Sequence, residues 1–419
     1  MKRTSLLLAW LVLLWAGACM AQAEPVPPPR WVASWAAAPL QHFPAVAPAG
    51  AAPAPAAFPA RTTLRQRVFP TVGGDRVRVR FSNLFGTVPL HVAEASAAIG
   101  TGGPALSPAT LRPLYFGGQR AVTIAPGTEA WSDAAPVAVR AGQALAVSFY
   151  LDEATPFGTA HHLPLSATWA VSGNAVTRAT LDGAVQPDWN HIVTGLDVAA
   201  AAPARVVVAF GDSITEGVNA FAPVRTRYPD RLAERLREPA KAGATVAVLN
   251  AGISGNRLLS DWIGPKGIDR FERDVLGQSG VTHAIILIGI NDIGFGALNG
   301  PAGSPVPVGD PVSAEQLAAG LQRLIDQARA KGVKVVLGTL LPIKGSGYWN
   351  ADNEARRQAL NRWIRGRQQV DVVDFDAAMR DPRDPQALNP LYDSGDHLHP
   401  GDAGYAAMAS AIDLRQLLD

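Results

Sequence analysis

Short apolar runs alternate with longer helical patterns through the second half of the chain, and this alternation restricts the possible folds more than any other feature. The runs lie at 205–210, 245–249, 284–290, 333–340 and 370–375. Strands that alternate with helices build a mostly parallel sheet covered by helices on both faces. Because ligands bind such sheets outside the carboxyl ends of the strands, near a switch in strand order, we expect chemistry directly after these runs.

The segments between and after these runs carry helix signals. Ser313 can cap a helix with Gln316 in the capping-box position, and apolar residues at helical spacing follow until Gly332 ends the pattern. Further helices fit 353–365 and 403–418.

The first half has a different pattern. From about 62 to 193, short segments of alternating polarity are separated by Gly, Pro and Asp turns, which is typical of a β-sandwich. In the segment 76–81 the arginines share one face and the valines the other, as in a half-buried strand. We expect the arginine face to be solvated; a sugar-binding role is the alternative.

The first residues read as an export signal. Lys2 and Arg3 precede an apolar run at 6–16, and small residues lead to Ala23. A buried helix is one alternative, but the run is shorter than a membrane span. A lipoprotein anchor through Cys19 is another, although the leucine usual three residues before such a cysteine is missing. We therefore expect a periplasmic or extracellular protein.

Four segments are predicted along the chain. They are a signal peptide at 1–23, an Ala/Pro-rich N-terminal segment at 24–61, a β-sandwich domain at 62–200 and an α/β domain at 201–419. The Ala/Pro-rich composition favours extended, poorly packed backbone. Near its start, Trp31 and Trp35 are expected to tie the chain to a domain surface.

The charge balance and the cysteine count limit the kinds of partner and of metal site that we expect. Without Lys2 and Arg3 the chain has 35 basic and 35 acidic residues and no long basic run, so we expect no nucleic-acid partner. No later apolar stretch is long enough to span a membrane. The sole cysteine is Cys19, so the chain after the leader has no disulfide and no cysteine metal site. The sequence leaves the oligomeric state open.

Chemically useful residues follow three consecutive predicted strands. Ser213 lies in the segment 211–217, Gly255 in 250–256 and Asn291 in 289–292. Alone, the serine would be read as a helix cap and the other two as turn residues. Together they supply a nucleophile and N–H donors, which the tetrahedral intermediate of acyl transfer requires.

A base is available in the last motif, at 393–400. His399 follows Asp396 by three positions, and His397 follows Asp393 by four. Histidine exchanges a proton near neutral pH, and an adjacent carboxylate fixes its tautomer and stabilises the imidazolium. Both pairs are candidates from the residues alone, and His397 can equally be a metal ligand or a packed core residue.

These segments, in this order, resemble the sequence blocks of the SGNH (GDSL-type) hydrolases. The resemblance implies an α/β/α three-layer hydrolase domain with a flavodoxin-like parallel sheet at 201–419, and a catalytic triad of Ser213, Asp396 and His399. It also implies an oxyanion hole formed by the Ser213 amide, the Gly255 amide and the Asn291 side chain, with no cofactor and no metal. The N-terminal half is similar to that of two-domain, arylesterase-like acylhydrolases associated with xylan degradation.

We therefore expect a secreted serine esterase that hydrolyses short-chain acyl esters, acetyl esters foremost, on carbohydrate. An exported enzyme with an additional β-domain suits a polymeric substrate. Trp262, Tyr348 and Trp349 are candidates either for stacking on sugar rings or for ordinary packing of loop aromatics. The alternatives are a lipid or aryl esterase, a polysaccharide O-acyltransferase, and a glycan-binding protein whose hydrolase half is vestigial.

Overall fold

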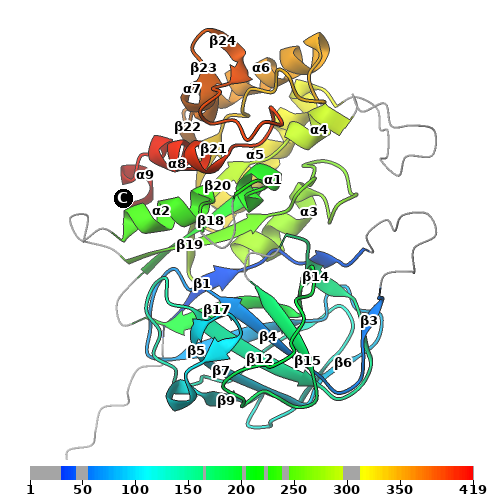
Figure 1. Cartoon of the computed structure of the whole chain (residues 1–419). Coiled ribbons are helices and arrows are strands. Elements are labelled where there is room, and N and C mark those ends of the chain that lie inside the picture. Colours follow the sequence, from blue (N-terminus) through cyan, green and yellow to red (C-terminus); the bar gives the residue numbers. More distant parts are fainter. Residues whose placement is uncertain are drawn as a thin grey trace, which may run out of the picture.

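The computed structural model describes residues 30–43, 55–163, 167–200, 204–220, 225–237, 245–295 and 312–418. These residues form two bodies stacked on each other, a β-sandwich from the first half of the chain and an α/β body from the second (Figure 1). The predicted signal peptide and Cys19 lie outside the described residues.

A parallel sheet forms the centre of the α/β body. Its strands are β18 (Ala204–Gly211), β19 (Thr245–Gly252), β20 (Val281–Leu287), β21 (Lys334–Gly338) and β22 (Asp371–Val373). Their order is β19-β18-β20-β21-β22, so the chain moves outward in opposite directions on the two sides of β18. The predicted parallel sheet is confirmed, and its switch point lies where β18 ends.

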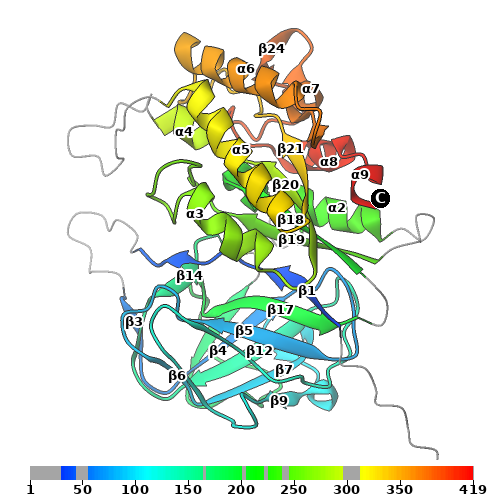
Figure 2. The same ribbon diagram turned by 180° about the vertical axis from the view of Figure 1, so that it is seen from behind.

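Helices cover both faces of this sheet. Figure 1 shows α2 and α8 in front of it, and Figure 2, from behind, shows α3 and α5. The helices are α1 (Ser213–Glu216), α2 (Tyr228–Leu236), α3 (Gly267–Phe271) with its π-helical continuation Glu272–Leu276, α4 (Ile290–Gly294), α5 (Ala314–Ala330), α6 (Ala351–Arg365), α7 (Phe375–Met379), α8 (Asp402–Ala411) and α9 (Arg415–Leu418). Within the described ranges, none of the helices has the length and apolar character needed to cross a membrane.

The helix predictions agree with the structure at α5 and α6. The predicted capping box of α5 is confirmed, because Ser313 Oγ accepts from the Gln316 N–H and Gln316 Oε1 accepts from the Ser313 N–H. The single helix predicted at 403–418 is wrong. The chain becomes extended at Ile412, and Asp413 then accepts from the Arg415 N–H, so α9 begins as a separate helix.

Three of the predicted strands end earlier than expected, among them the run at 333–340, whose strand β21 ends at Gly338. The run at 284–290 leaves the strand after Leu287, because Gly289 has φ of +125° and α4 begins at the next residue. The run at 370–375 ends at Val373, because the Asp374 side chain accepts from the Ala377 N–H and starts α7.

The β-sandwich packs two sheets face to face. One contains β1 (Trp31–Ala36), β17 (Val193–Ala199), β5 (Val77–Ser82) and β11 (Glu129–Trp131). The other contains β15 (Thr168–Ser172), β4 (Thr62–Val68), β12 (Leu145–Leu151), β7 (Glu94–Gly102), β8 (Ala105–Leu106) and β9 (Arg112–Leu114). Phe81 of β5 meets Phe149 of β12 edge to face, with ring centroids 5.6 Å apart, so apolar residues of both sheets form the sandwich core.

The remaining short strands lie outside these three sheets. They are β2 (Leu40–Gln41), β3 (Ala57–Phe58), β6 (Leu90–Val92), β10 (Val122–Ile124), β13 (Thr155–Pro156), β14 (Thr159–His161), β16 (Asn190–His191), β23 (Arg380–Asp381) and β24 (Asp384–Leu388).

The first sheet of the sandwich faces the α/β body, and this contact bears on two expectations. Strand β1, which contains Trp31 and Trp35, pairs with β17 and is largely buried, and its Ala33 N–H donates to Ser279 O of the α/β body, so the expected attachment of this stretch is confirmed. The arginine face of β5 is not a solvated face. Arg78 pairs with Asp197 and lies over the Trp131 ring, and Arg80 is only 7% exposed.

Candidate active site

Ser213 lies at the carboxyl end of β18, in the turn that starts α1. The Asp212 side chain accepts from the Ile214 N–H and caps this short helix. A side chain at Gly211 would clash, because a Cβ there would lie 2.2 Å from Thr215 Oγ1 and 2.3 Å from Leu287 O. The tight turn leaves Ser213 only 6% exposed, at the switch point of the sheet.

His399 comes to this serine from the loop before α8. Its Nε2 lies 2.8 Å from Ser213 Oγ, and its Nδ1 lies 2.7 Å from Asp396 Oδ2. This spacing matches the requirement for a base that takes a hydroxyl proton while a carboxylate fixes its other nitrogen.

Asp396 is itself held in place. Its Oδ1 accepts from the backbone N–H groups of Leu398 and His399, and its Oδ2 accepts from Asn219 Nδ2. Burial alone would raise the pKa of Asp396, but the hydrogen bonds from His399 and the two backbone N–H groups outweigh it, so the pKa lies well below its ordinary value. The carboxylate therefore stays ionised beside the imidazole.

The alternative pair, Asp393 and His397, forms a separate contact. His397 Nδ1 lies 2.5 Å from Asp393 Oδ2, but the His397 side chain is 52% exposed and its backbone has φ of +62°. The loop therefore brings His399, and not His397, to Ser213.

Gly255 occupies a tight turn after β19. The Asn256 N–H donates to Ile253 O, Gly255 has φ of +72°, and Ser254 keeps a negative φ, which together define a type II turn over 253–256. The third turn position requires a positive φ, which glycine adopts without strain. The Gly255 N–H, in the central peptide of this turn, has no acceptor within the described part of the chain.

Asn291 lies in the first turn of α4 and is nearly inaccessible to solvent. Its Oδ1 accepts from the Tyr348 hydroxyl at 2.9 Å, and its Nδ2 donates to Asn256 O at 3.0 Å. These bonds fix the orientation of the amide and leave its second N–H for another acceptor.

The three aromatic residues singled out in the sequence differ in their surroundings. Tyr348 and Trp262 both pack edge to face against Phe295, and Tyr348 also orients Asn291. Trp349 is an exposed side chain. A direct hydrogen bond to Asn291 was not predicted for Tyr348, and its loop position alone gave no signal for one.

Two buried carboxyl groups lie close to this site. Burial raises the pKa of Asp212 to about 7, although the Ile214 N–H and His399 oppose the shift. Burial also raises the pKa of Asp292 to about 6, although this carboxyl accepts from the N–H groups of Leu258 and Leu259. Near neutral pH the Asp212 carboxyl is therefore partly protonated, whereas Asp292 is mostly ionised.

Three further residues at the site were missed from the sequence. Arg270, wholly buried, donates to Gly211 O and Ala251 O at the ends of β18 and β19. Glu216 and His161 form a buried pair between the two bodies. A charged residue three positions after the serine was the only available signal for Glu216, and no sequence signal joined His161 to it.

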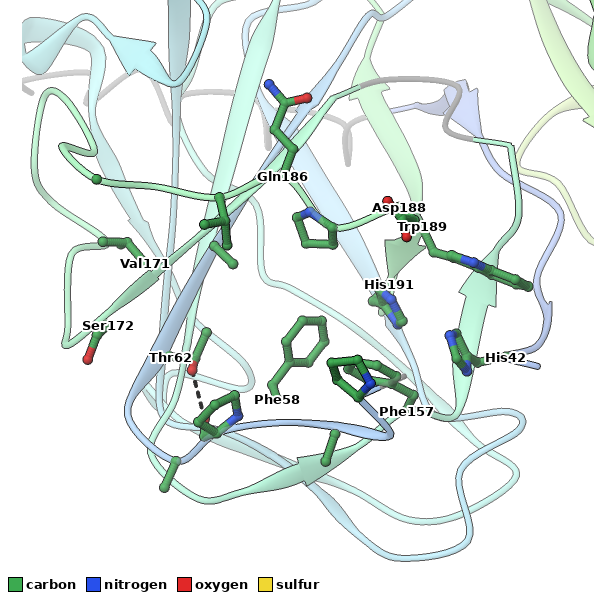
Figure 3. Close-up of a pocket in the computed structure, with 18 residues that line it drawn as sticks. His42, Phe58, Thr62, Phe157, Val171, Ser172, Gln186, Asp188, Trp189 and His191 are labelled. Atoms are coloured by element: carbon green, nitrogen blue, oxygen red, sulfur yellow. Dashed lines mark hydrogen bonds between the residues drawn. The ribbon is translucent and has the colours of Figure 1, made fainter. Parts of the chain in front are cut away.

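Two concave regions lie apart from the serine. The sandwich contains an open pocket of about 550 Å³ among Phe58, Phe157, Trp189, His42 and His191 (Figure 3). A groove of about 570 Å³ lies between the two bodies. Its lining combines aromatic and polar side chains: Gln41, His42, Phe43, Phe85, Asp261, Trp262, Gly264 and Pro265.

Comparisons with known proteins agree on the second half of the chain. Residues 209–407 match the GDSL-like Lipase/Acylhydrolase family. No curated protein matches the chain in sequence.

Similar solved structures cover about half of this chain. Axe2, an acetylxylan esterase from Geobacillus stearothermophilus, is 22% identical over 52% of this chain and 94% of its own, with a TM-score of 0.38. LAE5, an alpha/beta hydrolase enzyme from the metagenome of Lake Arreo, is 22% identical over 52% of this chain and 96% of its own, with a TM-score of 0.38. A member of the lipolytic protein G-D-S-L family from Veillonella parvula is 17% identical over 50% of this chain and 96% of its own, with a TM-score of 0.35. The family match to residues 209–407, together with the parallel sheet, identifies the α/β body as a GDSL-like (SGNH) hydrolase domain and the protein as a carboxylic ester hydrolase.

Proposed function

We propose that the protein is an exported serine esterase that removes short acyl groups, acetyl groups foremost, from carbohydrate. The observation that carries the proposal is the position of His399, 2.8 Å from the Ser213 hydroxyl and 2.7 Å from Asp396. His399 takes the hydroxyl proton as Ser213 Oγ attacks the ester carbonyl carbon, and Asp396 stabilises the imidazolium that forms.

The negative charge then develops on the former carbonyl oxygen. The Ser213 and Gly255 N–H groups and the Asn291 side chain donate hydrogen bonds to it. As the tetrahedral intermediate collapses, the leaving alcohol takes the proton from His399 and the acyl group stays on Ser213 Oγ. Water attacks the acyl-enzyme with His399 as base, and the second collapse releases the carboxylic acid and restores the serine.

Two features support a short acyl group on a sugar. The Tyr348 ring lies against Gly294 while its hydroxyl holds Asn291, so an aromatic ring fills space beside the Asn291 amide. The groove between the two bodies presents aromatic faces with Gln41 and Asp261 nearby. Rings with an apolar face and polar edges, as in a polysaccharide, fit such a lining.

Replacing Ser213 by alanine tests the reaction itself. We expect Ser213→Ala to lose at least about 10³-fold in kcat for p-nitrophenyl acetate while its circular dichroism spectrum stays unchanged. Full residual activity in this variant would refute the proposed nucleophile.

The substrate class needs a second assay. A series of p-nitrophenyl esters of increasing acyl length, run beside acetylated xylan, should show a preference for acetyl and release of acetate from the polymer. A preference for long chains would instead indicate a lipid esterase. Hydrolysis of the p-nitrophenyl esters with no release of acetate from acetylated xylan would indicate an aryl esterase. Acetylation of an added sugar acceptor would indicate an acyltransferase.

Export rests on the leader alone. We expect the N-terminus of the protein secreted by its natural host to begin at Glu24, as Edman sequencing would show. A lipid-modified Cys19 at that terminus would indicate anchoring instead.

A further inference from the structure

A histidine of the β-sandwich reaches the active-site region of the hydrolase domain. His161 is the last residue of β14 and is only 2% exposed. Strand β14 lies beside the contact between the two bodies (Figure 1). Its Nδ1 lies 2.9 Å from Ala38 O within the sandwich, and its Nε2 lies 2.8 Å from Glu216 Oε1 in α1. Because a carbonyl oxygen only accepts, Nδ1 donates to Ala38 O, and this bond orients the ring so that Nε2 lies against the carboxylate.

Glu216 is wholly buried one turn after Ser213. Burial opposes its charge, but the ion pair with His161 and the hydrogen bonds from Ser254 outweigh this, so the pKa of Glu216 lies below its ordinary value. The buried carboxylate therefore keeps its charge, and it lies against an imidazole that the other domain supplies.

The second oxygen of this carboxylate holds the turn that contains Gly255. Glu216 Oε2 accepts from both the Ser254 N–H and the Ser254 hydroxyl, each at 2.5 Å. Ser254 is the second residue of the type II turn and Gly255 the third, so their shared peptide carries the N–H assigned to the oxyanion. A flip of this peptide, from type II to type I geometry, would turn that N–H away.

From these contacts we infer that His161 is a positioning residue for ester hydrolysis, acting through Glu216 and Ser254 on the Gly255 N–H. The β-sandwich thus completes the oxyanion hole, in addition to any part it has in holding substrate. This inference rests on the proposed serine-esterase function.

The test compares His161→Ala with His191→Ala. His191 is also a buried imidazole of the sandwich, on the strand that pairs with β14, and its ring contacts are with His42, Phe58 and Phe157 of the same domain. With p-nitrophenyl acetate we expect His161→Ala to lower kcat about 10- to 100-fold with KM within about twofold, because the loss of one oxyanion donor costs about 10²–10³ and here the donor is displaced and not removed. His191→Ala should keep kcat within about twofold.

A transition-state analogue separates positioning from partial unfolding. Phenylboronic acid forms a tetrahedral anion on a serine oxygen, so its Kd should rise in His161→Ala by the same factor by which kcat/KM falls. If the variant only reduced the folded fraction, kcat would fall while the Kd of the folded molecules stayed at the wild-type value, and this result would overturn the inference.

Two further variants keep the test decisive. In His161→Ala/Glu216→Gln the buried charge is removed while an amide oxygen still accepts from Ser254, so we expect part of the lost kcat to return. If His161→Ala does not fold, Ser254→Ala replaces it: this residue is partly exposed, and losing its hydroxyl bond should lower kcat several-fold at constant KM. Wild-type kcat in His161→Ala, or in Ser254→Ala where that variant is needed, would refute the inference. Activity that survives Ser213→Ala would instead refute the proposed function.

Discussion

Replacing Arg270 by methionine would remove the guanidinium that ties together the strand ends beneath the candidate site. The side chain is wholly buried and donates to Gly211 O at 2.7 Å, Ala251 O at 2.9 Å and Asn256 Oδ1 at 2.9 Å, and it pairs with Asp274 at 3.0 Å. It therefore links β18, β19, the turn after β19 and the π-helical segment that follows α3.

The expected loss of stability depends on which hydrogen-bond donors the acceptors of Arg270 keep after the substitution. Gly211 O keeps the Ile253 N–H and Asp274 keeps Arg273, but Asn256 Oδ1 has no other donor among the described residues. Removing one partner of a buried ion pair costs about 3–5 kcal/mol in the free energy of unfolding. Since 1 kcal/mol moves Tm by about 2–4 °C for a domain of this size, we expect the hydrolase domain of Arg270→Met to melt about 6–20 °C below wild type.

Calorimetry at pH 7 measures this difference, with Arg329→Met as the matched control. Arg329 is 55% exposed and lies 3.9 Å from Asp326, an exposed pair whose loss costs at most about 1 kcal/mol. Arg270→Lys should melt between the wild type and Arg270→Met, because lysine keeps the charge but not the planar set of donors. Our reasoning is wrong if Arg270→Met and Arg329→Met melt at the same temperature.

Three further predictions follow from the site. Asp396→Asn should lower kcat about 10³- to 10⁴-fold, because an amide in that position no longer stabilises the imidazolium of His399; a loss below tenfold in p-nitrophenyl acetate hydrolysis would contradict this role. Tyr348→Phe removes the hydroxyl that orients Asn291, so kcat should fall about tenfold at constant KM, and a changed KM with unchanged kcat would point to substrate contact instead. Burial raises the pKa of Asp212 from 3.8 to about 7, so between these values the native state holds a proton that the unfolded chain has lost, and this group lowers stability as pH rises. Tm of Asp212→Asn, followed from pH 4 to pH 8, should therefore decline less steeply than that of the wild type, and parallel curves would show that the carboxyl titrates normally.

The parallel sheet and the long helices follow from sequence because their signals are local and repeated. The capping box at Ser313 and the apolar spacing after it specify α5 without help from the rest of the chain. The boundary errors have an equally local cause. Gly289 and Asp413 each stop a regular element where side-chain polarity alone suggested that it continued.

The arginine face of β5 is a feature whose burial local sequence patterns do not predict. Alternation predicts that Arg78 and Arg80 point away from the sandwich core, but it does not predict that Arg78 bonds to the hydrolase domain or that Arg80 is buried beside Thr194. The face expected to be solvated contacts Ser279 through Arg78, and Ser279 lies 201 positions later in the chain. Only the docking of the two bodies distinguishes a solvated face from a buried one.

The candidate site also contains residues that local sequence patterns predict and residues that they do not. Ser213, Gly255, Asn291 and His399 are visible in the sequence because each follows a strand or precedes a helix, so the topology of one sheet gathers them. Glu216 differs, because a carboxylate buried one turn after the serine is unfavourable unless a cation and hydrogen-bond donors meet it. That requirement can be stated from the hydrolase domain alone, but the imidazole that lies against Glu216 comes from the sandwich, by a contact that no local pattern encodes. If His161 acts as inferred, an isolated hydrolase domain would keep every residue of the family motifs and still lack a correctly held oxyanion hole.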